Sequence, residues 1–151
     1  MLNGAPSEYF YQTDLKKNPD TTWNIITNAL NNKYNIGADT PSKTIFGLAK
    51  AHAHTVIGAY TLKDTNGKVA ARLLRIRNPW AKDTYTGPWN DADSKWTAAY
   101  KAQVPYTKND NDGGFFIDVS DFVNGFTYFS VNYVHDNWAH SKYEVLNDNG
   151  A

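Results

Sequence analysis

Residues 51–62, AHAHTVIGAYTL, are followed by DTNG at 64–67 and by VAARLLRI at 69–76. The two outer segments are rich in β-branched and apolar residues, and the DTNG segment supplies residues that tolerate the positive φ of a tight turn. This pattern predicts a β-hairpin, and it is the best hairpin signal in the chain. The rest of the fold is inferred outward from this hairpin.

The flanking segments predict a sheet with one main helix. Asn18-Pro19-Asp20 combines a capping residue, a proline suited to the first helical turn and an acidic residue that favours the helix dipole, so a helix is predicted at about residues 19–32. The remaining segments are predicted as a loop at 34–43, a long loop at 80–114, strands at 115–118 and 126–134, and a short turn or helical piece at 120–124. The predicted fold class is α+β: a mostly antiparallel twisted sheet with one main helix and long loops, in one compact unit.

Composition excludes several classes of function. The chain has 151 residues, about one domain, and its 15 basic and 15 acidic residues give a formal net charge of zero. No overall positive field therefore favours nucleic acid. No apolar run approaches the roughly 18 residues of a membrane span, and the first residues lack the pattern of a signal peptide. We expect no nucleic-acid partner, no membrane span and a cytoplasmic location, with cytoskeletal association left open.

Cysteine is absent from the sequence. Its absence excludes disulfides, thiolate zinc sites and iron–sulfur clusters. It also removes the nucleophile that a thiol protease needs. No motif indicates an organic cofactor.

His52 and His54 lie two residues apart in the first predicted strand, so their side chains are expected on the same face of the sheet. Two imidazoles on one face indicate either a metal pair or one functional histidine with a neighbour. A metal site needs a third ligand, and His135 and His140 lie far along the chain without a carboxylate cluster, so a metal is disfavoured. Either histidine taken alone would by default be a half-buried side chain of the sheet.

The second predicted strand ends in RIRNPW at 75–80, which the hairpin returns to the neighbourhood of His52. An asparagine beside an imidazole can accept a hydrogen bond from one ring nitrogen, which fixes the tautomer and turns the other nitrogen toward a nucleophile. Asn78 is placed for this contact, and Trp80 would cover it and exclude water. A histidine followed about 26 residues later by Asn-Pro-Trp across a hairpin is the arrangement of Cys-His-Asn proteases, whose cysteine comes from an earlier part of the chain.

Four motifs extend this pattern over almost the entire chain. They are LAKAHAHTVIGA at 48–59, RIRNPW at 75–80, TGPWND at 86–91 with Trp96, and DGGFFI at 112–117 with Asp121-Phe122. In this order and spacing they resemble the second protease subdomain of calpains, which are papain-like cysteine proteases. The resemblance implies the β-rich lobe of the protease core for residues 1–137, and a linker or the start of a following β-sandwich domain for residues 138–151.

By this resemblance His52 matches the catalytic histidine, Asn78 the residue that orients its imidazole, and Trp80 the indole that shields the pair. In a complete calpain, a cysteine of the first subdomain forms an ion pair with this histidine and attacks the peptide carbonyl. The resemblance therefore implies a Cys-bearing first subdomain as partner, in the same parent chain or in a separate polypeptide. It also implies protein or peptide substrates.

The chain departs from the family pattern beside these residues. His54 falls where the family usually has an aromatic residue. Ala51 and Ala81 stand where glycine is common, which narrows the local freedom of the backbone.

The resemblance also implies a calcium ion held by two loops. Asp91, Asp112 and the carbonyl of Asp110 stand at matching positions, whereas two further carboxylates of the family are replaced by Thr84 and Gly114. Because calcium prefers six to eight oxygen ligands including several carboxylates, we expect weak binding or none. Nearby residues could compensate or could be solvated turn residues: Asp83, Asp93 and Asn111.

Three hypotheses follow. In the first, the chain is part of a calcium-regulated calpain-type cysteine endopeptidase, supplies the base His52 and the orienting Asn78, and is inactive alone. In the second, it is a non-catalytic calpain-like protein-binding or scaffold module. In the third, it is one half of a split enzyme. The presence of His52, Asn78 and Trp80 together favours a catalytic parent, because a scaffold needs no matched imidazole and carboxamide.

Overall fold

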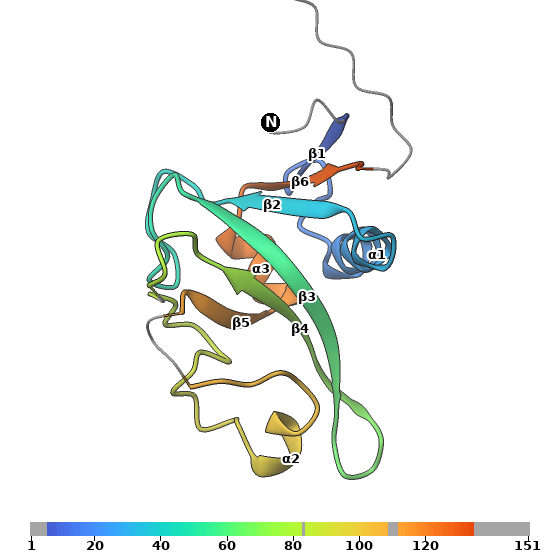
Figure 1. Cartoon of the computed structure of the whole chain (residues 1–151), viewed down its shortest axis with the longest axis vertical. Helices are drawn as coiled ribbons and strands as arrows, with labels where there is room; N and C mark the ends of the chain where they lie inside the picture. Colours follow the sequence, from blue (N-terminus) through green and yellow to red (C-terminus); the bar gives the residue numbers. More distant parts are fainter. Residues whose placement is uncertain (1–5, 83, 109–111, 135–151) are drawn as a thin grey trace, which may run out of the picture.

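The computed structural model describes residues 6–82, 84–108 and 112–134 (Figure 1). In chain order the elements are β1 (Ser7–Tyr11), α1 (Pro19–Asn31), β2 (Asn35–Asp39), β3 (Ala53–Lys63), β4 (Val69–Arg77), α2 (Ala98–Lys101), β5 (Gly114–Asp118), α3 (Val119–Gly125) and β6 (Tyr128–Asn132). The strands form an antiparallel sheet in the order β1-β6-β2-β3-β4-β5. The predicted α+β class is confirmed. Within the described ranges, no helix is long and apolar enough to cross a membrane.

The predicted hairpin is formed by β3 and β4, which run together to their turn in Figure 1. Asp64 stabilises the turn, because its Oδ1 atom accepts the N–H groups of Asn66 and Lys68, each at 2.9 Å. The register of the two strands shifts between Val56 and Gly58, so Ile57 is an extra residue in β3. Such a bulge reverses which side chains of the strand face which side of the sheet.

Each face of the sheet carries its own apolar core. On one face, α1 and α3 pack together and bury Ile26 and Phe122 against strand residues such as Ile76. On the other face, the segment at 84–108 lays Trp89 and Trp96 against a second cluster. That cluster also contains Leu62, Ala71, Leu73, Val104 and Phe116. Because of the bulge, β3 contributes to both cores: Val56 before it belongs to the first core and Leu62 after it to the second.

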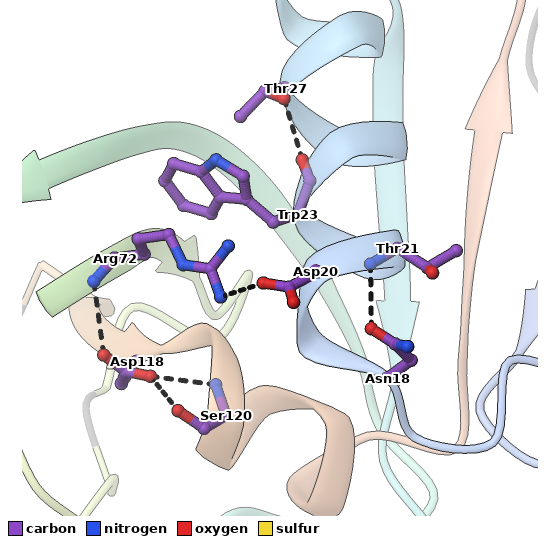
Figure 2. Close-up of polar contacts among 8 residues, drawn as sticks. All are labelled: Asn18, Asp20, Thr21, Trp23, Thr27, Arg72, Asp118 and Ser120. Atoms are coloured by element: carbon purple, nitrogen blue, oxygen red, sulfur yellow. Dashed lines mark hydrogen bonds and ion pairs between the residues drawn. The ribbon is translucent and has the colours of Figure 1, made fainter.

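Figure 2 shows how Arg72 of β4 joins the helix layer to the sheet. Its guanidinium lies 2.7 Å from the Asp20 carboxylate at the start of α1, and 5.6 Å from the centroid of the Trp23 ring. The main-chain N–H of Arg72 donates to the carboxylate of Asp118, which also caps α3. Because Asp20 is 79% exposed, the ion pair contributes about 1 kcal/mol at most.

The main helix begins where the sequence predicts it. The Asn18 side chain accepts the N–H of Thr21 at 3.1 Å, Pro19 occupies the first turn, and α1 ends at Asn31, one residue before the predicted end. The predicted helical piece at 120–124 is α3, and the predicted strands at 115–118 and 126–134 correspond to β5 and β6.

Two strands lie where none was predicted. The prediction of a loop at 34–43 is wrong for β2, in which Ile36 and Ala38 point into the first core between β3 and β6. Gly37, which suggested a break, lies within β2, where a Cβ atom would lie 3.1 Å from the Oγ of Ser130 on β6. β1 was missed as well, and it pairs at the sheet edge with β6, where Phe10 stacks on Phe129 at 5.0 Å.

The predicted long loop at 80–114 is largely irregular, but α2 lies within it. Gln103, just after α2, exchanges two hydrogen bonds of 2.9 Å with the main chain of Lys63 at the end of β3. These bonds hold the segment against the hairpin. The predicted boundary between residues 137 and 138, and the histidines at 135 and 140, lie outside the described residues.

Candidate active site

His52 lies immediately before β3, and Thr40 holds its main chain on both sides. The His52 N–H donates to Thr40 Oγ1 at 2.9 Å, and the Thr40 N–H donates to the His52 carbonyl at 3.1 Å. The His52 side chain is only 8% exposed. The prediction that His52 lies within the strand is wrong, because Ala51, with a φ of 44°, turns the chain and β3 begins only at Ala53.

Asn78 follows the last residue of β4 and meets the imidazole across the hairpin. Its Oδ1 atom lies 2.8 Å from Nε2 of His52, and its Nδ2 atom donates to the carbonyl of Lys82 at 2.9 Å. Since Nδ2 has an acceptor of its own, the amide orientation is fixed and Oδ1 faces the histidine. A carboxamide oxygen can only accept, so Nε2 of His52 carries the hydrogen. The neutral ring therefore keeps its lone pair on Nδ1.

Trp80 lies over the His52 ring. The two ring centroids are 3.7 Å apart with an interplanar angle of 33°, and the main-chain N–H of Trp80 donates to Oδ1 of Asn78 at 3.0 Å. The side chain is nevertheless 68% exposed. One face of the indole thus covers the imidazole, while much of the indole surface is open to solvent or to a partner.

A tight approach of two backbones holds Asn78 in place. The Asn78 N–H donates to the carbonyl of Gly113 at 2.7 Å. Gly113 has a φ of 72°, and a Cβ atom there would lie only 2.5 Å from the Asn78 carbonyl oxygen. Ala81 has a φ of 51°, and its N–H donates to that same carbonyl at 3.1 Å. The site therefore depends on left-handed backbone at Gly113 and Ala81.

His54 is the second buried imidazole of the site. Its ring centroid lies 4.9 Å from that of His52 in an edge-to-face arrangement, and its Nδ1 atom lies 3.2 Å from the His52 carbonyl. Burial, followed by repulsion from His52, lowers the pKa of His54 from 6.5 to about 4. His54 is therefore neutral at physiological pH, and the two rings lie on one side of the sheet as their spacing predicted.

The residues predicted to hold calcium are only partly described. Asp91 is buried, with its carbonyl accepting the Tyr106 hydroxyl at 2.8 Å. Asp112 is half-buried, and its two carboxylate oxygens accept the Gly114 N–H at 2.7 Å and the Thr107 hydroxyl at 3.2 Å. Asp110 and the nearby Asp83 and Asn111 lie outside the described residues, whereas Asp93 caps its own loop.

These residues fit a calcium ion poorly. Within the ranges that the structure describes, no group of three or more His, Cys, Asp or Glu side chains has an arrangement that could hold a metal ion. Gly114 brings no side chain, and the Asp112 carboxylate is already used by its own loop. Calcium normally takes six to eight oxygen ligands, so a site here would need ligands beyond the side chains of Asp91 and Asp112.

The arrangement around His52 can take up a proton at Nδ1 and hand it on. Nε2 is anchored, Trp80 covers the ring, and the sequence contains no cysteine to serve as a nucleophile beside it. A cavity of about 430 Å³ lies elsewhere, lined by Ala70, Pro88, Trp89, Lys95, Tyr100, Asp118 and Asp121. The imidazole thus lies at a surface covered by Trp80, and this cavity does not include it.

Comparisons with known proteins show the family of the chain. A family model described as "Calpain family cysteine protease" matches residues 1–133. The chain belongs to the calpain family of cysteine proteases. It is 32% identical to the calpain-2 catalytic subunit of Homo sapiens over 86% of this chain and 19% of that protein. It is 34% identical to calpain-14 of Homo sapiens over 69% and 16%, and 30% identical to the Gallus gallus calpain-2 catalytic subunit over 95% and 21%. The chain thus spans about a fifth of the length of the curated relatives that it matches.

The calpain-family chain brings the three predicted site residues together, and their catalytic roles stay predictions. Sequence reasoning missed Thr40 and Gly113, which hold the backbones of His52 and Asn78. Gly113 could have been found from the Asp-Gly-Gly motif, because adjacent glycines indicate a close backbone approach. Thr40 carried no signal, since its contact to His52 depends on the unpredicted strand β2.

Proposed function

We propose that this chain supplies the general base and its orienting group to a calpain-type cysteine endopeptidase, with the thiol nucleophile coming from a Cys-bearing first protease lobe. The observation that carries the proposal is the 2.8 Å contact between His52 Nε2 and Asn78 Oδ1. It leaves Nδ1 as the basic nitrogen, which is the atom that would take a proton from a thiol. The chain alone is inactive, because it contains no cysteine.

In the proposed reaction, His52 first accepts the thiol proton at Nδ1, and the resulting thiolate attacks the carbonyl carbon of a peptide substrate. The imidazolium then gives that proton to the leaving amine. Asn78 keeps the ring in one orientation throughout, since its oxygen accepts the Nε2–H in both the neutral and the charged form of His52. Trp80 excludes water from one side of the ring and so protects this hydrogen bond.

A reconstitution assay tests the proposal. The chain is mixed with the Cys-bearing first lobe of a calpain, association is measured by size-exclusion chromatography, and cleavage of a quenched fluorescent peptide is followed. We expect cleavage only when both lobes are present, and none with His52→Ala, although that variant still associates. The second subdomain of the same calpain serves as the positive control for the first lobe.

Two outcomes would contradict the proposal. Full turnover by the His52→Ala variant would show that another group acts as base. Association without cleavage, while the positive control is active, would instead support a non-catalytic calpain-like binding module. The exposed surface of Trp80 would then serve contact with a partner protein.

We further propose that calcium binding by this chain itself is weak or absent, and that any calcium regulation of the parent protein acts through other segments. Support comes from the replacement of two family carboxylates by Thr84 and Gly114, and from the internal hydrogen bonds of Asp112. Repeating the reconstitution with millimolar calcium and with a chelator tests this point. Calcium-dependent cleavage that is lost in the Asp91→Asn variant would contradict it.

A further inference from the structure

The main chain at His52 is held by two side chains from different places in the sequence. Thr40 lies just after β2, and His54 lies on β3. The hydroxyl of Thr40 accepts the His52 N–H at 2.9 Å, and Nδ1 of His54 lies 3.2 Å from the His52 carbonyl. Both side chains are buried. The N–H and the carbonyl of His52 thus each have a side-chain partner.

The Thr40 hydroxyl also closes the turn that precedes His52. It donates to the Ala49 carbonyl at 2.6 Å, and the His52 carbonyl lies 3.1 Å away as an alternative acceptor. Ala51 lies between these two acceptors, Ala49 and His52, and has a φ of 44°. Its N–H donates to the Pro41 carbonyl at 2.8 Å. An alanine in left-handed conformation is strained, so this turn needs contacts that hold it. Thr40 supplies three of them through one side chain and one N–H.

His54 can hold the carbonyl only as a donor. A carbonyl oxygen accepts but does not donate, so Nδ1 of His54 carries the hydrogen in this contact. The rest of the ring faces Phe115 and Phe126 edge to face, with centroids at 6.1 and 5.4 Å. This apolar surrounding disfavours a charge on His54. A neutral His54 donates one hydrogen bond and places no second positive charge beside His52 when His52 is protonated.

We propose that Thr40 and His54 are positioning residues for His52, which fix its main chain so that Nε2–H stays on Asn78 and Nδ1 stays open for the nucleophile. This inference rests on the proposed function for its meaning, but its geometry is independent of any partner. The hydrogen bonds of both side chains around His52 go to main-chain atoms and not to the ring nitrogens of His52. A phenylalanine at position 54 would fill the same space but could not hold the carbonyl.

Magnetic resonance on the isotope-labelled chain alone tests the proposal. Long-range proton–nitrogen correlations of His52 give the tautomer, and solvent exchange of its Nε2–H gives the rate at which the bond to Asn78 opens. We expect the Nε2–H tautomer in the parent. Thr40→Val keeps the shape but removes the hydroxyl, and should raise the exchange rate about tenfold, which corresponds to the loss of one net hydrogen bond. Thr40→Ser should restore the parent rate.

The matched control is Thr55→Val, the same change at an exposed position of β3, which should leave the His52 ring signals unchanged. Unchanged exchange and tautomer in a folded Thr40→Val variant would overturn the proposal. If that variant does not fold, His54→Phe gives the decision, because it removes the hydrogen bond to the carbonyl but keeps an aromatic ring at this position. An unchanged rate there overturns the proposal equally. No Cys-bearing lobe is needed, so a failure here is distinct from an absence of peptide cleavage, which would contradict the proposed function.

Discussion

The Oδ1 atom of Asn78 lies 2.8 Å from Nε2 of His52, and the two residues flank the open end of the β3–β4 hairpin, His52 just before β3 and Asn78 just after β4. That oxygen also accepts the main-chain N–H of Trp80, and the side-chain amide nitrogen of Asn78 donates to the main-chain carbonyl of Lys82. One side chain therefore orients the imidazole and closes the turn after β4. Removal of Asn78 should affect both catalysis and stability.

Asn78→Ala is expected to lower the turnover of the reconstituted protease by about one to two orders of magnitude, with little change in KM. The loss is smaller than that of His52→Ala, because Asn78 orients the base and does not transfer the proton. The buried partners left without a bond should also cost about 1–3 kcal/mol of unfolding free energy. Peptide cleavage and urea unfolding check the two effects, with Asn24→Ala, an exposed change on α1, as control. Equal turnover in parent and variant would exclude an orienting role.

Gly113→Ala should damage the same site from the residue before β5, the strand beside β4. The added Cβ atom would lie 2.5 Å from the Asn78 carbonyl oxygen, at a φ of 72°, so both contact and backbone oppose it. We expect a loss of about 3 kcal/mol in urea unfolding. Gly67→Ala is the matched control, because its φ is 77° but nothing lies within 4 Å of the added atom, and it should cost only about 1 kcal/mol. Equal costs for the two variants would show that the contact with Asn78 does not matter.

Replacement of Ala51 or Ala81 by glycine should stabilise the fold. Both have positive φ, 44° and 51°, at the positions where the resemblance to calpains leads us to expect glycine. Replacement by glycine relieves about 1–2 kcal/mol of strain. Part of this gain is offset, because glycine loses more conformational entropy on folding. We therefore expect each variant to be more stable by about 0.5–1 kcal/mol in urea unfolding. Ala53→Gly, at an exposed position within β3, should instead be less stable. A loss of stability in all three variants would contradict this account.

The elements that could be predicted from sequence are those with local signals. The hairpin turn at Asp64 and the cap at Asn18 are each satisfied by neighbours within four residues, so a short stretch of sequence contains the whole interaction. The meeting of His52 with Asn78 followed from the hairpin itself, because pairing of the two strands brings their far ends together.

What could not be predicted depends on contacts between distant segments. β2 has only Ile36 and Ala38 as buried apolar residues, and it is a strand because β3 and β6 supply hydrogen bonds on both sides. β1 is ordered by pairing with β6 near the other end of the chain. Thr40 reaches His52 only once β2 exists, so no local pattern could mark it. These cases show tertiary pairing overriding weak local propensity.

Restoring the missing carboxylates should create a calcium site. In the double variant Thr84→Glu and Gly114→Glu, the two positions where family carboxylates are replaced carry acids again, beside Asp91 and Asp112. We expect isothermal titration to show binding about tenfold tighter or more than in the parent, because calcium affinity rises with the number of carboxylate ligands. Thr84→Gln with Gly114→Gln is the neutral control and should not gain affinity. Tight binding by the parent chain itself would show that the present residues already suffice.

The low pKa of His54 predicts an acid-sensitive fold. Burial lowers this pKa from 6.5 to about 4, so the unfolded chain takes up the proton first as the pH falls. The contribution of neutral His54 to stability is therefore complete above about pH 6.5 and is lost progressively toward pH 4. Its size is on the order of 2 kcal/mol. His54→Phe cannot take up a proton, so its unfolding free energy should fall less than that of the parent between about pH 7 and pH 4.5. The decisive quantity is how the difference in unfolding free energy between parent and variant changes with pH. A difference that is the same at every pH reports only the lost hydrogen bond to His52. Parallel pH profiles for parent and variant would show that His54 is not the group whose protonation destabilises the fold.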